Sequence, residues 1–408
     1  MSINFKQMKI GILRETKTPP DRRVPFSPQQ VKLLMEQHSG TEVVVQPSPI
    51  RCFRDEEYAG AGVTLQEDLQ DRDVLMGVKE VKADTLLPDK TYFFFSHTAK
   101  KQPYNRHLLQ TVLEKRIRLV DYEYLTTPDG ARVVAFGHWA GIVWAYNGLR
   151  AWGERTGDYA LKPAWQCHDR KEMMAELHKV KLPPIKILIT GGGRVAYGAL
   201  ETLEPLHLTQ VAPEEFLTTT YDEPVICRID PDHYVRRKDD AMFDLKHFFE
   251  HPEMYRSVFF PYTQVTDLFI ACHYWDPRSP VFMTPEDYRT SGFKIKVIAD
   301  VSCDIGEPIP STLRASTIEE PFYGYDPQTG RESDPFDLKN VTVMAVDNLP
   351  GELPRDASED FGNMLMKRVM PALLGEDRDG IIERATIAEN GRLTEHFSYL
   401  QDYVEGKE

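Results

Sequence analysis

Three residues that exchange protons or carry charge each follow a short apolar run of the sequence. Lys79 follows "VLMGV", His97 follows "TYFFFS" and Glu123 follows "IRLVDY". The imidazole of histidine titrates near neutral pH, and a lysine can join the same proton transfers when its pKa is lowered. A cation, an imidazole and a carboxylate in corresponding places therefore suggest acid–base chemistry at one site.

The apolar runs themselves predict buried strands of a parallel sheet covered by helices. In the first third of the chain these strands are expected in "MKIGIL", "TEVVVQP", "DVLMGVK", "TYFFFSH" and "IRLVDYE". A helix is expected in "SPQQVKLLMEQ", with Ser27 as its N-cap and Pro28 as its first residue. Because ligands of open α/β sheets bind outside the carboxyl ends of the strands, Lys79, His97 and Glu123 are expected to converge on one cleft.

The loop after the first strand, "RETKTPPDRR", adds further charges, among them Lys17 and Arg23. Each charged residue has an ordinary explanation when it is taken alone. A lysine at a strand end is often simply solvated, a single histidine is often structural, and Arg23 could be a surface arginine. Their recurrence at matching positions, in a chain that also carries a nucleotide motif, favours an oxidoreductase with Lys79 and His97 in its cleft.

The nucleotide motif is "KILITGGGRVAYG", in which an apolar strand leads through glycines into a helix. In a G-x-G-x-x-G/A turn the first glycine, here Gly191, permits the tight turn, and the second, Gly193, lets a pyrophosphate approach the backbone. The third small residue, Ala196, lets the helix pack on the strand. Arg194 and Val195 open that helix, whose N–H groups can bind phosphate. A plain turn is the alternative, but the strand–turn–helix context favours a dinucleotide.

The choice between NAD and NADP depends on the residue that meets the ribose, normally an acid about 20 positions further on. That region reads "LHLTQVAPEEFL", with no aspartate at its apparent strand end. Glu214 and Glu215 are nearby, and Arg228 is a candidate for a 2′-phosphate. The sequence leaves the cofactor as NAD or NADP.

The composition fits a two-domain enzyme that handles small molecules. The chain has 408 residues and a formal net charge of -14, so two domains are expected and a general nucleic-acid binder is not. No apolar run is long enough to span a membrane, and no signal peptide is evident at the N-terminus, so a cytoplasmic protein is expected. The five cysteines form no CxxC pair, and no metal site is predicted. Oligomeric state is left open.

The second half of the chain continues the α/β alternation. Strands are expected in "PVICRI", "DLFIACH", "IKVIADVS" and "VTVMAVD". The stretch "RRKDDAMFDLKHFFEHPEMYRS" is interpreted as an exposed, partly helical insertion, and the C-terminal end as helices and turns.

The same motifs resemble those of a known superfamily. "GILRETK", "VLMGVKEV", "FFFSHTAK", "DVSCDIG" and "VDNLPGELPRDASEDFG" are similar to the alanine dehydrogenase superfamily, and in particular to its lysine-forming saccharopine dehydrogenases and lysine–ketoglutarate reductases. The resemblance implies two Rossmann-like doubly wound domains with a cleft between them, the cofactor domain being inserted into the substrate domain. The substrate domain would be residues 1–137 plus 346–408, and the dinucleotide-binding domain residues 138–345. The saccharopine-oxidising half of the bifunctional relatives is expected to be absent.

The resemblance also implies a reaction, the interconversion of L-lysine plus 2-oxoglutarate with saccharopine through an imine and a hydride transfer. Lys79, His97 and Glu123 would be catalytic, and Arg23 and Arg132 would hold substrate carboxylates. Two further positions, Asp304 and Asn348, match residues beside the nicotinamide. The alternatives are a 2-oxo acid reductive aminase of the alanine dehydrogenase type and a non-catalytic dinucleotide-binding module. The insertion and the "CHYWD" strand end favour the larger substrate.

This chemistry requires a lysine that can lose its proton near neutral pH. We expect Arg23, Arg132 and partial burial to lower the pKa of Lys79, and Glu123 to oppose them.

Overall fold

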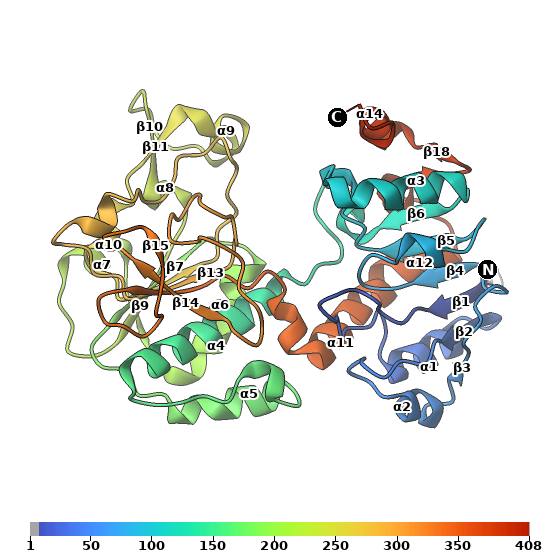
Figure 1. The fold of residues 1–408 in the computed structure, drawn as a ribbon, viewed down its shortest axis with the longest axis horizontal. Helices are drawn as coiled ribbons and strands as arrows, with labels where there is room; N and C mark the ends of the chain where they lie inside the picture. Colours follow the sequence, from blue (N-terminus) through green and yellow to red (C-terminus); the bar gives the residue numbers. More distant parts are fainter. Residues whose placement is uncertain (1–7, 408) are drawn as a thin grey trace. The chain divides into compact units, whose positions relative to one another are not determined.

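The structure is a computed structural model that describes residues 8–407, which form two compact units. One unit joins residues 8–136 to residues 354–407, and the other spans Gly137–Leu353 (Figure 1). Residues 1–7, on which the expected lack of a signal peptide partly rests, lie outside the described residues. Each unit contains one large, mostly parallel sheet, so the predicted α/β class with two Rossmann-like domains is confirmed.

The sheet of the first unit has the strand order β18-β17-β6-β5-β4-β1-β2-β3. From β3 to β6 the neighbouring strands are parallel, whereas β17 and β18 are antiparallel additions. The chain builds β2 and β3 on one side of β1 and then β4, β5 and β6 on the other, so the strand order reverses between β1 and β4. The strands are β1 (Met8–Ile12), β2 (Thr41–Val45), β3 (Thr64–Leu65), β4 (Val74–Met76), β5 (Thr91–Phe94), β6 (Arg118–Asp121), β17 (Thr386–Glu389) and β18 (Arg392–Leu393).

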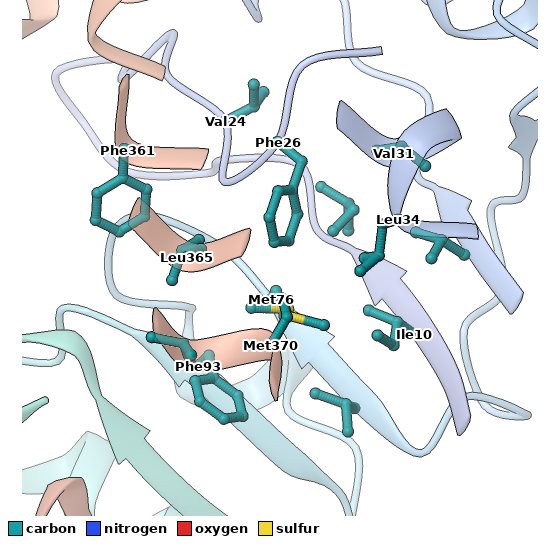
Figure 2. Close-up of a cluster of buried hydrophobic side chains, with 14 of the residues drawn as sticks. Ile10, Val24, Phe26, Val31, Leu34, Met76, Phe93, Phe361, Leu365 and Met370 are labelled. Atoms are coloured by element: carbon teal, nitrogen blue, oxygen red, sulfur yellow. The ribbon is translucent and has the colours of Figure 1, made fainter. Parts of the chain in front are cut away.

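Helices cover both faces of this sheet, because successive strand residues point to opposite faces. Phe93 packs with helices α1, α11 and α12, and its neighbour Phe94 packs with α3 on the other face. Figure 2 shows the first of these clusters, in which Phe361 and Leu365 from the C-terminal segment lie near Phe26. The helices are α1 (Pro28–Gln37), α2 (Asp55–Gly60), α3 (Arg106–Glu114), α11 (Pro354–Met364), α12 (Met370–Leu374), α13 (Ile381–Ala385) and α14 (Gln401–Val404).

The start of α1 is confirmed as predicted. Ser27 is its N-cap and Pro28 its first residue, and the Ser27 backbone N–H donates to Gln30 Oε1 at 2.9 Å. The prediction for the C-terminal end was wrong in part, because β17 and β18 form a hairpin there that extends the sheet next to β6. Asn390 and Gly391 both have positive φ in its turn, the conformation that Asn-Gly hairpins adopt.

The sheet of the second unit has the order β15-β14-β16-β13-β12-β7-β9-β8. Its strand order reverses between β7 and β12, and β14 and β15 add an antiparallel edge that was not predicted. The strands are β7 (Lys186–Thr190), β8 (Thr209–Gln210), β9 (Val225–Ile229), β12 (Leu268–Ala271), β13 (Val297–Asp300), β14 (Phe322–Asp326), β15 (Arg331–Ser333) and β16 (Val341–Met344). The helices are α4 (Gly137–Thr156), α5 (Arg170–Glu176), α6 (Arg194–Leu203), α7 (Pro213–Thr218), α8 (Pro231–Tyr234), α9 (Leu245–Glu250) and α10 (Phe260–Thr263).

The predicted insertion contains helix α9, but its two ends are strands. β10 (Val235–Arg237) pairs with β11 (Tyr255–Ser257) in an antiparallel ribbon of its own. Among residues 8–407, no helix is long and apolar enough to cross a membrane.

Helices α4 and α6 cross at very short range over the second sheet. A Cβ atom built on Gly141 of α4 would lie 1.8 Å from the Val195 carbonyl oxygen, and one on Gly198 of α6 would lie 2.2 Å from the His138 carbonyl oxygen. Because backbone cannot yield as a flexible side chain can, both positions require glycine. This contact fixes the start of α6, the helix that follows the glycine turn.

We predict that Gly141→Ala destabilises the second unit, because the added methyl group meets backbone. The expected loss is about 2 kcal/mol, which lowers the thermal unfolding midpoint by ~6 °C for a unit of this size. Gly137→Ala on the same helix is the matched control, because its Cβ would lie 3.5 Å from Val195 Cγ2, an ordinary contact. Equal midpoints for the two variants in a calorimetric scan would contradict this account.

Candidate active site

The carboxyl ends of β1, β4, β5 and β6 lie along one edge of the first sheet, because these neighbouring strands are parallel. Lys79 follows β4, His97 follows β5 and Glu123 follows β6. The loop that carries Arg23 follows β1, on the other side of the reversal from β5 and β6. The topology therefore brings the predicted acid–base residues to the place where open α/β sheets bind ligands.

The Lys79 ammonium lies next to a buried ion pair between Arg23 and Asp21. Both partners are 2% exposed, and Arg23 Nη2 lies 2.6 Å from Asp21 Oδ2. Burial and the nearby Arg23 guanidinium lower the pKa of Lys79 to about 8, while Asp21 opposes the shift. Although burial works the other way, Arg23 holds the pKa of Asp21 well below its usual range. Lys79 therefore exchanges its proton in the range where amine chemistry needs a base.

The Glu15 carboxylate hydrogen-bonds to the backbone of the turn that carries Lys79. It accepts hydrogen bonds from the N–H groups of Val78 at 2.6 Å and Lys79 at 3.0 Å. Burial, with the charge of Asp21, raises the pKa of Glu15 to about 8 despite these bonds. In the sequence Glu15 is one of several charges in the loop after β1, and nothing there indicates these hydrogen bonds.

His97 has a carboxylate partner that sequence analysis missed. His97 Nδ1 lies 3.5 Å from Glu80 Oε2, and Lys17 Nζ lies 2.6 Å from Glu80 Oε1. Burial opposes ionisation, but the contacts with the His97 imidazole and the Lys17 ammonium lower the pKa of Glu80 to about 2. Because Glu80 directly follows Lys79, the turn after β4 carries one predicted acid–base residue, Lys79, and the carboxylate that contacts the other, His97. The signal was present in the sequence as "VKEV".

Glu123 and Arg132 pair with each other and do not act on Lys79 as expected. Arg132 Nη2 lies 2.6 Å from Glu123 Oε1, and Lys100 Nζ lies 3.6 Å from Glu123 Oε2. The carboxylates that oppose the pKa shift of Lys79 are Asp21 and Glu80, so that part of the prediction was wrong. The Arg132 side chain is about half exposed (49%), in contrast to the buried Arg23.

The second unit carries the glycine turn directly after β7. Gly191 has φ +99°, and a Cβ there would lie 2.7 Å from the Cys272 carbonyl oxygen, so glycine is required. A Cβ on Gly193 would meet no atom within 4 Å. The space in front of α6 is therefore open at Gly193, where a pyrophosphate would approach. Ala196 is fully buried, and Arg194 and Val195 form the first turn of α6.

Asp230 occupies the place where an acidic residue was sought in the sequence, and it was missed there. β9 lies next to β7, and Asp230 directly follows it, at the position that contacts the ribose in dinucleotide-binding domains. Asp230 Oδ1 pairs with Arg228 Nη1 at 2.6 Å. Glu214 and Glu215 lie instead in α7. Strand β8 and helix α7 separate the glycine turn from β9, so the usual spacing of ~20 residues failed as a guide.

The remaining predicted cofactor residues follow strands at the same edge of the second sheet. Asp304 follows β13, its backbone N–H donates to Ser302 Oγ at 3.3 Å, and burial raises its pKa. Asn348 follows β16. Within residues 8–407 no group of three or more His, Cys, Asp or Glu side chains is placed to hold a metal ion.

Comparison with known proteins agrees with this architecture. Residues 11–143 match the family described as "Alanine dehydrogenase/PNT, N-terminal domain". An L-alanine dehydrogenase has a similar structure, with a TM-score of 0.65 at 20% identity over 98% of this chain and 99% of that one. The transhydrogenase from Sinorhizobium meliloti gives a TM-score of 0.58 at 15% identity, over 95% and 98% of the two chains. These structures share the fold.

Residues 11–143 thus match the model of the N-terminal domain of alanine dehydrogenases, and the resemblance found in the sequence is borne out by named relatives. Similar proteins include lysine-forming saccharopine dehydrogenases, such as that of Yarrowia lipolytica, named NAD(+), L-lysine-forming, at 26% identity over 90% of this chain and 92% of that protein. The mitochondrial alpha-aminoadipic semialdehyde synthase of Rattus norvegicus is 31% identical over 98% of this chain and 48% of that protein. The chain spans about half the length of such synthases.

We predict that Lys79 titrates near pH 8 and that Arg23→Gln raises its pKa by about one unit or more. The substitution removes a neighbouring cation and frees Asp21, and both changes favour the charged ammonium. The measurement is an NMR titration of ¹³C-dimethylated lysines, with the Lys79 signal identified by its loss in Lys79→Arg.

Arg14→Gln is the matched control, because Arg14 lies in the same loop but pairs with Glu67. It should leave the Lys79 titration unchanged. A wild-type Lys79 that titrates near its ordinary value of 10.5, or an Arg23→Gln variant without effect, would contradict the proposed electrostatics.

Proposed function

We propose that this protein is an oxidoreductase that interconverts L-lysine plus 2-oxoglutarate with saccharopine. The observation that carries the proposal is Lys79 at the carboxyl end of β4, with its pKa lowered to about 8 and a histidine–carboxylate pair at the next strand end. The Rattus norvegicus semialdehyde synthase and the Yarrowia lipolytica saccharopine dehydrogenase, which the chain resembles over 98% and 90% of its length, support the substrate assignment.

The proposed reaction forms one C–N bond and removes one oxygen. The ε-amine of the substrate lysine attacks the ketone carbon of 2-oxoglutarate, the carbinolamine loses water, and the resulting imine accepts a hydride at carbon. Lys79 Nζ and His97 Nε2 exchange protons with the amine nitrogen and the departing oxygen, since His97 Nδ1 is held by Glu80. In reverse, saccharopine is oxidised to the imine, which water hydrolyses.

The three carboxylates of saccharopine require cationic partners. The half-exposed Arg132 fits this role, because a planar guanidinium can hold a carboxylate with two hydrogen bonds. Arg23 differs, since it is buried and paired with Asp21. We therefore assign to Arg23 an electrostatic role toward Lys79 in addition to the substrate binding predicted from the sequence.

We propose that the second unit, predicted as residues 138–345, holds a nicotinamide dinucleotide. Gly191, Gly193 and the start of α6 would hold its pyrophosphate, Asp230 its ribose, and Asp304 and Asn348 would lie beside its nicotinamide. When bound, the nucleotide supplies or accepts the hydride. Asp230 and the NAD(+)-named relatives support NAD over NADP, because a carboxylate accepts hydrogen bonds from a ribose diol and repels a 2′-phosphate.

The first test is nicotinamide absorbance with NADH, using lysine plus 2-oxoglutarate in one mixture and pyruvate plus ammonium in another. We expect oxidation in the first mixture only. Lys79→Met should lower kcat about a hundredfold or more and remove the limb of the pH–rate profile near pH 8. Lys90→Met is the control, since Lys90 precedes β5 at the opposite edge of the same sheet.

Activity in the second mixture alone would favour a 2-oxo acid reductive aminase, and activity in neither would favour a non-catalytic nucleotide-binding module. An unchanged pH–rate profile and unchanged substrate affinity in Lys79→Met would contradict its assigned role.

The cofactor assignment has its own test in Asp230→Ser. This substitution removes the repelling carboxylate and frees Arg228 to meet a 2′-phosphate. We expect the ratio of kcat/KM for NADPH to that for NADH to rise about tenfold or more. Glu214→Gln on α7 is the matched control and should leave the ratio within about twofold. A wild-type preference for NADPH would contradict the assignment.

A further inference from the structure

One buried carboxylate at the end of β6 holds two loops of the first unit. Asp121 is fully buried, and its Oδ2 accepts hydrogen bonds from the Ser96 backbone N–H at 2.9 Å and the Ser96 hydroxyl at 2.6 Å. Its Oδ1 accepts the backbone N–H of Glu123 at 2.8 Å. The carboxylate thereby anchors Ser96, which precedes His97 in the loop after β5, and Glu123 in the loop after β6.

The conformation of His97 depends on these contacts. His97 has φ +53°, in the left-handed region that non-glycine residues rarely adopt. The neighbouring residues Ser96 and Thr98 are both fully buried, and their hydroxyl oxygens lie 2.8 Å apart. The Thr98 backbone N–H donates to Ser96 Oγ at 3.3 Å. His97 thus lies between Ser96 and Thr98, which are both buried and hydrogen-bonded. This series of hydrogen bonds ends at the Asp121 carboxylate.

We propose that Asp121 is a positioning residue that sets the placement of both His97 and Glu123 for the acid–base chemistry. The proposal rests on the proposed function, in which His97 exchanges protons with the substrate. It adds a residue that touches neither substrate nor cofactor and acts through the loops that follow β5 and β6.

The second unit contains a related arrangement at the end of β13, in which the aspartate and the serine belong to the same strand end and not to neighbouring strands. Asp300, also fully buried, accepts the Ser302 N–H at 3.0 Å and the Ser302 hydroxyl at 2.8 Å through Oδ1. The next residue, Cys303, has φ +56°, and the Asp304 N–H donates to Ser302 Oγ at 3.3 Å. In both units a serine that is bonded to a buried aspartate precedes a left-handed residue at a strand end. In the second unit this arrangement positions Asp304, which we assign to the nicotinamide.

A carboxylate suits this position because each of the three groups that hydrogen-bond to it is a donor. Its two oxygens accept three hydrogen bonds, whereas an asparagine amide would turn one NH₂ group toward a backbone N–H. One backbone donor would then be buried without an acceptor. Burial raises the pKa of Asp121, and the bonds from Ser96 and Glu123 oppose that shift, which agrees with donors arranged to stabilise the ionised form.

The test compares Asp121→Asn with Asp300→Asn in the full chain. For Asp121→Asn we expect kcat to fall between about ten- and a hundredfold, with KM for NADH within about twofold of wild type. The ¹H–¹³C signal of the His97 imidazole, identified by its loss in His97→Gln, should shift. For Asp300→Asn, KM for NADH should rise and the His97 signal should remain in place.

A purely structural role for Asp121 would lower the thermal midpoint and leave kcat and the His97 signal unchanged, and that result would overturn the proposal. If Asp121→Asn does not fold, Ser96→Ala replaces it. This variant removes the hydroxyl bond and keeps the Ser96 N–H bond, so kcat and the His97 signal should change to a smaller extent. An unchanged Ser96→Ala would equally overturn the proposal. If the wild-type protein shows no lysine-dependent activity, the proposed function is contradicted instead. The comparison of the His97 imidazole signals still decides whether Asp121 positions His97.

Discussion

The partial burial of Lys79 beside the buried Arg23–Asp21 ion pair is the constraint on which the first unit depends. A lysine in water holds its proton too tightly to act as a base near neutral pH, so the protein must make the charged form costly. Burial and Arg23 lower the pKa of Lys79, and Asp21 limits that decrease. The Arg23–Asp21 pair lies in the loop after β1, and Lys79 lies in the turn after β4. Because β1 and β4 are parallel neighbours where the strand order reverses, the two segments leave the sheet side by side.

The surrounding residues maintain this arrangement through backbone contacts. Glu15 accepts the N–H groups of the Lys79 turn, and Asp121 accepts those of the loops that carry His97 and Glu123. Carboxylates that accept backbone N–H groups thus hold the loops of the predicted acid–base residues. In the second unit Asp300 accepts the Ser302 N–H and two hydroxyls, and burial raises its pKa to about 6 against these hydrogen bonds. Chain segments distant in sequence contribute to one core, since Phe361 and Leu365 pack with Phe26 (Figure 2).

The sequence predicted the central strands well, because strands buried on both faces appear as continuous apolar runs. It also located the glycine turn and the strand ends at Lys79, His97 and Glu123. The peripheral hairpins were missed because short edge strands lack such runs, although Asn390–Gly391 is a hairpin signal for β17 and β18. Asp230 was missed because a helix and a strand lengthen the usual spacing. The Glu80–His97 pair joins the loops after β4 and β5, so "VKEV" shows the carboxylate but not the imidazole that it meets. Glu123 and Arg132 are brought together within the segment after β6 by the bridge between Thr126 and Arg132, which carries no apolar run.

The most direct measurement of the central claim is the identity of the product. Lysine labelled with ¹⁵N at the ε-nitrogen, 2-oxoglutarate, and NADH carrying deuterium at both C4 positions of the nicotinamide would be incubated with the protein and analysed by mass spectrometry. Our account predicts a product with the composition of saccharopine that carries one ¹⁵N in its secondary amine and one deuterium on the former ketone carbon. An amino acid that forms only when ammonium is added, or deuterium transfer that does not require lysine, would contradict it.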